Sequence, residues 1–255
     1  MQCAGREADD LEVGTTRQTS LPAHYELTWS QWVFSAASIA VAFVLIAAVG
    51  YRIVSAIDVR TWWAPLAVLA GMTVADFASG MIHWGADTWG RDDYPVIGRR
   101  LLVPFRVHHV NPDDLLRRPF VDANGDAAFL VIPVLIALGM LPLDRPWSGP
   151  VSVFGLAFCA FGSMTNQIHQ WAHMPRPPRV VRALQAVGLL LGRSEHALHH
   201  ARPYDCRYCI TTGWCNRPLE AVRFFRVFEA AITRLTGVAP RHDDRRSEAR
   251  LAGNE

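Results

Sequence analysis

Histidines are the residues whose type and placement suggest chemistry in this chain. Eight of the ten histidines fall into three groups, namely His83 with His108 and His109, His169 with His173, and His196 with His199 and His200. Neutral imidazole is the commonest metal ligand in proteins, and a nitrogen-rich set with few cysteines or carboxylates suits iron better than structural zinc. Each group lies at the edge of a long apolar stretch. The pattern therefore predicts metal-dependent oxygen chemistry on a lipid, at a membrane surface.

The spacings within the groups favour shared metal ions. His169 and His173 are four residues apart, and His196 precedes His199 and His200 by three and four residues. Residues at these offsets share one face of a helix, so two imidazoles can reach one ion without a bend in the backbone. We therefore expect each of these two groups to lie on a short helix that faces the metal.

Two metal ions are predicted rather than one. Eight imidazoles exceed the four ligands that satisfy a single zinc ion. The adjacent His108 and His109 point about 100° apart on a helix, so they suit two metals, or one metal and a supporting contact. Asp87 follows His83 by four residues and is expected either to be a further ligand or to orient His83. Asp113 and Asp114 are candidates for the same supporting role.

The alternatives to a metal site are weaker. Any one of these histidines alone would more often be an ordinary interfacial residue, but three groups with helical spacing jointly favour metal binding. Cys206, Cys209 and Cys215 include one C-x-x-C, and no second pair completes a zinc site, so we interpret them as buried or incidental thiols. Five cysteines in total do not form a disulfide framework, which favours a reducing compartment.

Apolar stretches predict the elements that position the histidines. Four stretches are long enough, or nearly so, to cross a hydrocarbon core of about 30 Å. We therefore predict an all-α, polytopic membrane protein in which Asp76, within the second span, faces the bundle interior, where we interpret it as an interhelical hydrogen-bonding group. The predicted divisions are a polar tail (1–26), a membrane domain (27–240) with spans at about 32–51, 62–82, 127–143 and 151–169, and a disordered tail (241–255).

The arginines predict the orientation of the spans. The chain has no lysine, and with four spans 22 of its 25 arginines lie on the side shared by both termini and the central loop. The positive-inside rule places that side in the cytoplasm, which in a bacterium means a multi-pass protein of the inner membrane. All eight grouped histidines then lie at the cytoplasmic face, where they form a di-metal cap. The arginine-rich end is balanced by acidic residues, so no nucleic-acid partner is expected.

Several motifs resemble one family of lipid-modifying enzymes. They are GMIHWGADTWG (80–90), PFRVHH (104–109), NGD (124–126), TNQIHQWAH (165–173), HALHH (196–200) and CITTGWCNRPLE (209–220). Over about residues 62–240 the chain resembles the plasmanylethanolamine desaturase family. This family includes an animal enzyme, bacterial counterparts tied to light-induced carotenoid synthesis, and a plastid branch that acts on phosphatidylglycerol. Asn111 departs from the pattern, because an aspartate is expected there in the animal enzyme.

The resemblance implies a chemistry and a set of ligands. It implies a di-iron centre held by His83, His108, His109, His169, His173, His196, His199 and His200, with O2 as co-substrate. The reaction would convert the 1-O-alkyl chain of an ether phospholipid into a 1-O-alk-1'-enyl chain, as in plasmalogen synthesis. We expect the lipid phosphate at the interface near Arg202, Arg207 or Arg217.

The electron donor must be a separate protein. The sequence has no dinucleotide-binding fingerprint and no recognisable flavin or haem domain, so we expect a ferredoxin, a rubredoxin or a cytochrome b5 type partner.

Two other functions stay open. One is a related di-iron acyl desaturase or hydroxylase, because iron ligation does not define the substrate. The other is a zinc-binding membrane sensor or hydrolase without redox chemistry.

Overall fold

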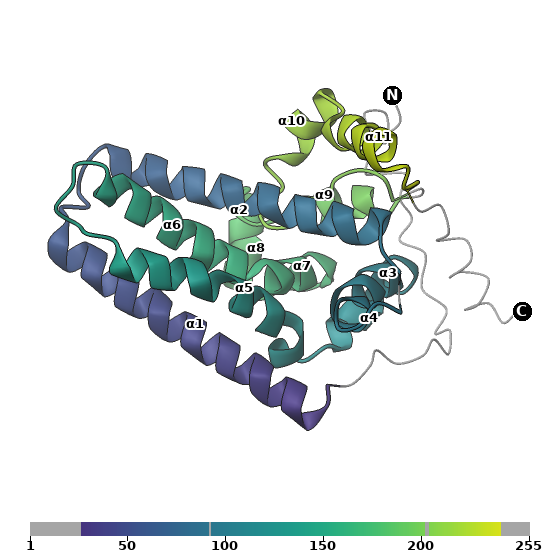
Figure 1. Ribbon diagram of the computed structural model, residues 1–255, viewed down its shortest axis with the longest axis horizontal. Coiled ribbons are helices and arrows are strands. Elements are labelled where there is room, and N and C mark those ends of the chain that lie inside the picture. Colours follow the sequence, from purple (N-terminus) through teal and green to yellow (C-terminus); the bar gives the residue numbers. More distant parts are fainter. Residues whose placement is uncertain (1–26, 92, 202–203, 241–255) are drawn as a thin grey trace, which may run out of the picture.

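Three long helices and one bent pair of helices form the body of the molecule. The computed structural model describes residues 27–91, 93–201 and 204–240, and every regular element within those ranges is a helix (Figure 1). The body consists of α1 (Trp29–Ala56), α2 (Trp63–Thr88), α5 (Phe120–Met140), α6 (Ser148–Ser163) and α7 (Thr165–His173). The predicted tails 1–26 and 241–255 lie outside the described residues.

The spans largely agree with the prediction. Helices α1, α2 and α5 are each long and apolar enough to cross a membrane. Helices α6 and α7 pass the same test only as a pair, which is bent by 47° at the break between them. The protein therefore has three candidate spans, or four if the bent pair is one span, and the predicted all-α membrane architecture is confirmed.

Local sequence explains where the first span begins. The Thr28 hydroxyl accepts a hydrogen bond from the amide of Gln31, whose side chain accepts one from the Thr28 amide. This reciprocal capping box satisfies two amides that a helix start otherwise leaves without partners. Helix α5 also begins before its apolar run, at Phe120, so that NGD (124–126) lies within the helix.

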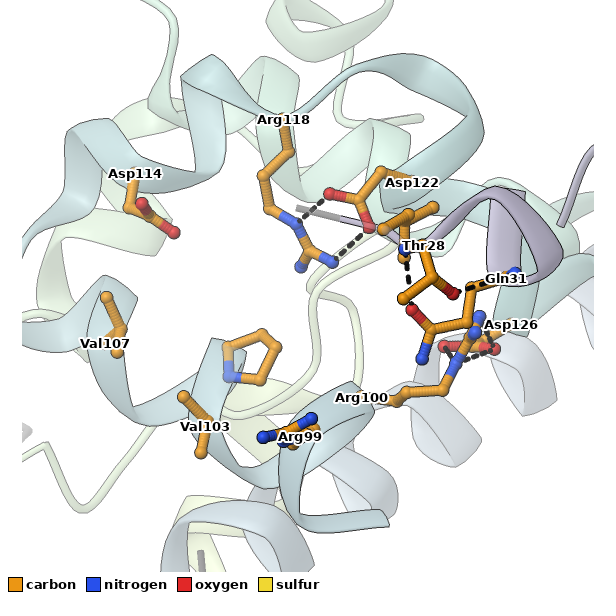
Figure 2. A pocket seen from close by; sticks show the side chains of 12 residues that line it. Thr28, Gln31, Arg99, Arg100, Val103, Val107, Asp114, Arg118, Asp122 and Asp126 are labelled. Carbon is orange, nitrogen blue, oxygen red and sulfur yellow. Dashed lines mark hydrogen bonds and ion pairs between the residues drawn. The ribbon is translucent and has the colours of Figure 1, made fainter. Parts of the chain in front are cut away.

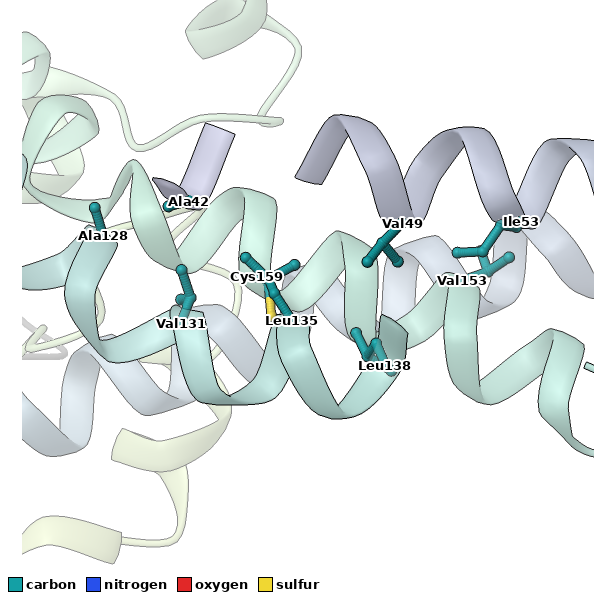
Figure 3. Close-up of a cluster of buried hydrophobic side chains, with 9 residues drawn as sticks. All are labelled: Ala42, Val49, Ile53, Ala128, Val131, Leu135, Leu138, Val153 and Cys159. Carbon is teal, nitrogen blue, oxygen red and sulfur yellow. The ribbon is translucent and has the colours of Figure 1, made fainter. Parts of the chain in front are cut away.

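Close helix packing builds the bundle. Helix α1 packs along α5, and α2 packs along α6 (Figure 1). A Cβ on Gly71 of α2 would overlap the carbonyl oxygen of Phe154 and lie 2.9 Å from the Cβ of Ala157, so only glycine permits this approach. Buried apolar side chains fill the space between α1, α5 and α6, among them Val49, Leu135 and Cys159 (Figure 3).

Most of the short helices gather at one end of this body, whereas α8 (Arg179–Ala186) lies nearer its middle (Figure 1). The others are the π-helix η2 (Gly98–Leu102), α3 (Val103–Val110), α4 (Pro112–Arg117), α9 (Arg193–His199), α10 (Asn216–Ala221) and α11 (Phe224–Thr236). Helix α7 packs against α4, α5 and α9, and α3 packs against α2. The histidine groups lie on α3, α7 and α9 and at the adjoining end of α2.

Candidate metal centre

The three histidine groups meet in one cluster. The rings form two sets that share His108, and within each set one nitrogen from each ring lies within 4.8 Å of the others. The first set is His108, His169, His173, His196 and His200, and the second is His83, His108, His109 and His199. Six of the eight residues are buried, and His173 and His200 are partly buried.

Helical spacing aims the rings as the sequence predicts. His169 and His173 lie on α7, while His196 and His199 lie on α9 with His200 at its carboxyl end. On α3, the neighbouring His108 and His109 divide differently, because His108 belongs to both sets and His109 only to the second. The arrangement is consistent with a di-metal site in which the His108 ring lies between the two positions.

The nitrogen atoms fit a pair of cations. The Nε2 atom of His196 lies 2.8 Å from that of His169, 2.8 Å from that of His173 and 3.0 Å from that of His200. In the second set, the Nε2 atoms of His109 and His199 are 2.9 Å apart. Lone pairs that converge in this way repel one another unless a proton or a cation lies between them. The donor chemistry therefore fits metal ions.

Burial keeps the imidazoles in the neutral form that binds metals. The pKa values of four rings are well below the usual value, mainly because the rings are buried and secondly because they neighbour other imidazoles. The four are His108, His109, His196 and His200. Burial also lowers the pKa of His199 to about 4. At neutral pH these rings carry no charge, so their lone pairs are available to a metal.

Main-chain carbonyls orient two of the imidazole rings by contacting their Nδ1 atoms. The Nδ1 atom of His83 lies 3.1 Å from the carbonyl oxygen of Tyr208, and the Nδ1 atom of His199 lies 2.6 Å from that of Cys206. An Nδ1–H that donates to a carbonyl leaves Nε2 with its lone pair facing inward. Among the described atoms, the buried Nε2 of His83 has no hydrogen-bond partner. Both carbonyls belong to one loop, residues 206–215, which we call the carbonyl loop.

Asp76 anchors the carbonyl loop. Its Oδ1 accepts hydrogen bonds from the amides of Thr211, Thr212 and Gly213 and from the Thr211 hydroxyl, and its Oδ2 accepts one from the amide of Cys215. The predicted interhelical hydrogen bond was therefore wrong, because the partner is a loop. A buried carboxylate needs several donors, and a turn of consecutive amides supplies more of them than a side chain on a facing helix.

A second contact fixes the middle of the carbonyl loop. The Asn216 side chain accepts a hydrogen bond from the Cys209 amide and donates one to the Cys209 carbonyl. A Cβ on Gly80 would overlap the Cys209 sulfur, so glycine lets the loop approach α2. The Cys209 thiol is buried and Cys215 is partly buried, which agrees with their interpretation as thiols. Cys206 is instead disulfide-bonded, so its interpretation as a thiol was wrong.

The NGD segment joins three elements around the site. Asn124 donates to the Gln167 side chain, and Gln167 donates to Gln170. Gln170 donates in turn to the carbonyl oxygens of Leu115 and Arg118. This chain of side-chain amides ties α5 to α7, which carries His169 and His173, and to α4. Its members are polar residues inside helices, which sequence periodicity alone did not identify as site residues.

The carboxylates occupy different places. The Oδ2 atom of Asp87 lies 3.3 Å from Nε2 of His83, 3.5 Å from that of His109 and 3.8 Å from that of His199, on the metal-facing side of the rings. Asp114 is buried and Asp113 is exposed. Asn111 is buried at the junction of α3 and α4.

The arginines predicted to meet a phosphate differ in exposure and in their ion-pair partners. The Arg207 side chain is 9% exposed and forms ion pairs with Glu195 and Glu220. The Arg217 side chain is 78% exposed and pairs with Glu195. Arg202 lies outside the described residues. Their predicted contact with a phosphate remains a prediction.

Two kinds of supporting group were not predicted from the sequence. They are main-chain carbonyls that contact the histidines and polar side chains within the helices that carry them. The carbonyl oxygens of Cys206 and Tyr208 carry no signal in a sequence, because every residue has one. A signal did exist for the loop anchor, since a single aspartate in an otherwise apolar span requires several donors nearby. The polar NGD and TNQ segments next to the histidines were a similar signal.

Comparisons with known proteins agree with the geometry of the site. Residues 72–243 match the lipid desaturase domain model. A plasmanylethanolamine desaturase of Myxococcus xanthus is 44% identical over 79% of this chain and 72% of its own length. Plasmanylethanolamine desaturase 1 of Mus musculus is 41% identical over 70% of this chain and 68% of its own length.

A plant relative is more distant. The chloroplastic fatty acid desaturase 4 of Arabidopsis thaliana is 36% identical over 84% of this chain and 65% of its own length. No solved structure matches the chain. The matched region contains all eight clustered histidines, the anchor Asp76 and the carbonyl loop, and on this evidence the chain belongs to the lipid desaturase family.

Proposed function

We propose that this protein is a plasmanylethanolamine desaturase, which introduces the 1'–2' double bond into the alkyl chain of ether phospholipids. The observation that carries the proposal is the cluster of eight buried or partly buried histidines at one end of a membrane bundle. The identities of 44% and 41% to two plasmanylethanolamine desaturases support the choice of substrate.

The proposed ligands divide between two iron ions. His169, His173, His196 and His200 would hold one ion, and His83, His109 and His199 the other, with His108 between them. Asp87 faces the second position, which favours its role as a further ligand over that of orienting His83. Two bound irons would supply the activation of O2 that removal of hydrogen from an unactivated carbon requires.

The protein's own residues would position the substrate and exclude water. The reaction consumes one O2, two electrons and two protons, removes two hydrogens from neighbouring carbons and releases two waters. Burial of the cluster beneath the carbonyl loop keeps bulk water from it. The electrons would come from a separate ferredoxin, rubredoxin or cytochrome b5 type donor, and the site would face the cytoplasm of a bacterial inner membrane.

Lipid analysis tests the substrate. The chain is expressed in a host supplied with 1-O-alkyl ethanolamine phospholipid, and vinyl-ether lipids are measured by acid-labile aldehyde release. We expect vinyl-ether lipids with the unaltered chain and none with His173→Ala. The control Ser194→Ala changes an exposed residue on α9 and should leave the yield unchanged. Unsaturated acyl chains without vinyl ethers would instead support an acyl desaturase, such as the plant relative's name describes.

Metal analysis tests the cofactor. About two irons per purified chain are expected, and His196→Ala should lower that number. Stoichiometric zinc, together with activity in the absence of O2, would overturn the redox assignment.

A further inference from the structure

A charged cavity lies beside the histidine cluster. It has a volume of about 110 Å³ and is enclosed by the start of α1, η2, α3, α4 and α5 (Figure 2). Its lining includes four charged side chains that pair with one another: Arg100 on η2, Arg118 between α4 and α5, and Asp122 and Asp126 on α5. None of them takes part in the metal cluster.

The four charges form two ion pairs. In one pair, the Arg100 guanidinium donates to Oδ1 of Asp126 at 2.6 Å and from Nε to both carboxylate oxygens at 3.0 Å. In the other, Arg118 donates to the two oxygens of Asp122 at 2.9 and 3.0 Å. Both arginine side chains are only 15% exposed. The cavity therefore offers both signs of charge to a ligand at partly buried positions, where such contacts are stronger than in water.

A second cavity is lined both by these charges and by two of the histidines of the metal cluster. It has a volume of about 60 Å³ and shares all four charged residues, together with Pro104, with the first cavity. Its other lining includes the apolar side chains of Leu101, Phe105 and Leu115. It also reaches His108 and His169, one from each of α3 and α7. The lining thus combines charged, apolar and metal-binding side chains in one cavity.

These three kinds of side chain suit the charged headgroup, the apolar chain and the reacting carbons of an ether phospholipid. Six bonds separate the phosphorus from the first carbon of the alkyl chain, so the two atoms are at most about 7 Å apart. A headgroup site for this reaction must therefore lie close to the metals. Arg100 and Arg118 meet that requirement because they line the same small cavity as His108 and His169.

We propose that the two ion pairs are the headgroup site, which selects a zwitterionic phosphoethanolamine. Arg100 and Arg118 bind the phosphate, and Asp122 and Asp126 bind the primary ammonium. This inference rests on the proposed function and adds to it the residues that read the headgroup. A zwitterion gives each member of an existing ion pair an opposite charge, so it enters without leaving a buried charge uncompensated. A trimethylammonium group has no N–H to donate to the carboxylates, so ethanolamine is preferred to choline.

Steady-state kinetics with three ether lipids test the site. The metal-loaded protein in nanodiscs receives 1-O-alkyl lipids with ethanolamine, choline or bare phosphate headgroups. Arg118→Gln should raise KM for all three by roughly 10-fold or more, with little change in kcat, because a charge-assisted contact is lost. Asp126→Asn should raise KM for the ethanolamine lipid and leave the bare phosphate lipid unaffected.

A variant with a reversed ion pair separates a loss of lipid binding from a loss of folding. Combining Arg100→Asp with Asp126→Arg keeps an ion pair between η2 and α5 but exchanges its polarity. We expect normal iron content and weakened lipid binding. Arg91→Gln is the matched control, since Arg91 is an exposed arginine paired with Asp93, and it should change neither KM nor iron content.

Separate readouts distinguish the two proposals. Direct binding of the ethanolamine lipid, measured by quenching of tryptophan fluorescence, does not depend on turnover. If the unaltered chain makes no vinyl ether from any lipid, the proposed function fails, whatever the binding data show. If it makes vinyl ether but Arg100→Gln and Arg118→Gln leave KM and lipid binding unchanged, the headgroup site is wrong. An effect of Arg217→Gln in their place would move the headgroup to α10.

Discussion

At the scale of single residues, the site depends on imidazoles held without charge. Burial lowers the pKa of His199 to about 4 and keeps that of His196 well below its usual value. A ring that must stay neutral to fold and to bind metal competes with protons in acid. The unfolded chain presents the same ring to water, where its pKa is about 6.5.

The stability of the metal-free protein should therefore fall in mild acid. Between pH 6.5 and about 4 the unfolded state binds more protons than the folded state at His199, so the free energy of unfolding decreases as the pH falls through this range. Thermal unfolding of the metal-free protein in detergent should give a constant Tm above pH 7 and a lower Tm at each step from pH 6.5 to 4.5. A Tm that rises on acidification would contradict this assignment of neutral rings. Adding iron at pH 7 should raise the Tm.

At the scale of elements, the carbonyl loop is a structural support for the metal ligands. Asp76 holds residues 211–215 of this loop. The earlier part of the loop presents the carbonyls of Cys206 and Tyr208 to His199 and His83. A membrane helix thereby fixes the orientation of two imidazoles through a segment more than 120 residues away in sequence. The rings are aimed as much by this loop as by their own helices.

Asp76→Asn should weaken both the fold and the metal site. The amide nitrogen of asparagine cannot accept hydrogen bonds, so at least one buried loop amide loses its partner, at a cost of about 2 kcal/mol. Iron affinity should fall by about 10- to 100-fold, because support of the ligands is lost. Iron content and thermal unfolding measure the two effects. Thr73→Ala, an exposed change one turn away on α2, is the control, and equal effects of both variants would show that Asp76 has no special role.

Helix packing gives a second prediction at this scale. Gly71→Ala should lower the free energy of unfolding by about 2 kcal/mol, because the new Cβ would overlap the Phe154 carbonyl and force α2 away from α6. Gly162→Ala is the matched control, since its Cβ would meet Val131 at an ordinary 3.6 Å. Unfolding in a mixed-detergent titration compares the two. A similar loss in both variants would point to helix propensity or backbone effects in place of close packing.

At the scale of the whole molecule, the bundle separates two ends of different chemistry. The histidine cluster, the carbonyl loop and the charged cavity lie at one end, and the α1–α2 and α5–α6 connections lie at the other (Figure 1). The connections carry only two arginines, Arg60 and Arg145. Large exposed side chains between the ends, such as Val44 and Leu130, are apolar and suit a lipid environment.

Cysteine labelling checks the predicted orientation. In a variant without its native cysteines, Asp58→Cys should react with a membrane-impermeant maleimide added outside intact cells, because it lies in the α1–α2 connection. Tyr94→Cys, an exposed residue before η2, should react only after the cells are opened. The reverse pattern would place the active site outside the cytoplasm.

The sequence by itself determined the type of chemistry and the class of fold. Four-residue histidine spacings predicted shared ions because the helix repeat alone places such residues on one face, and the apolar runs predicted spans because hydrocarbon thickness sets their length. Both signals are local, so they survive without knowledge of the tertiary structure. The family motifs added the substrate class.

Only the tertiary structure decided which distant groups meet. It joined Asp76 to the loop at 211–215, placed the His108 ring between the two histidine sets, and put the ion pairs of Arg100 and Arg118 beside the ligands. None of these placements follows from sequence spacing, because each depends on how helices and loops far apart in sequence pack together. Main-chain carbonyls and amides, which every residue possesses, act in this protein only through that packing.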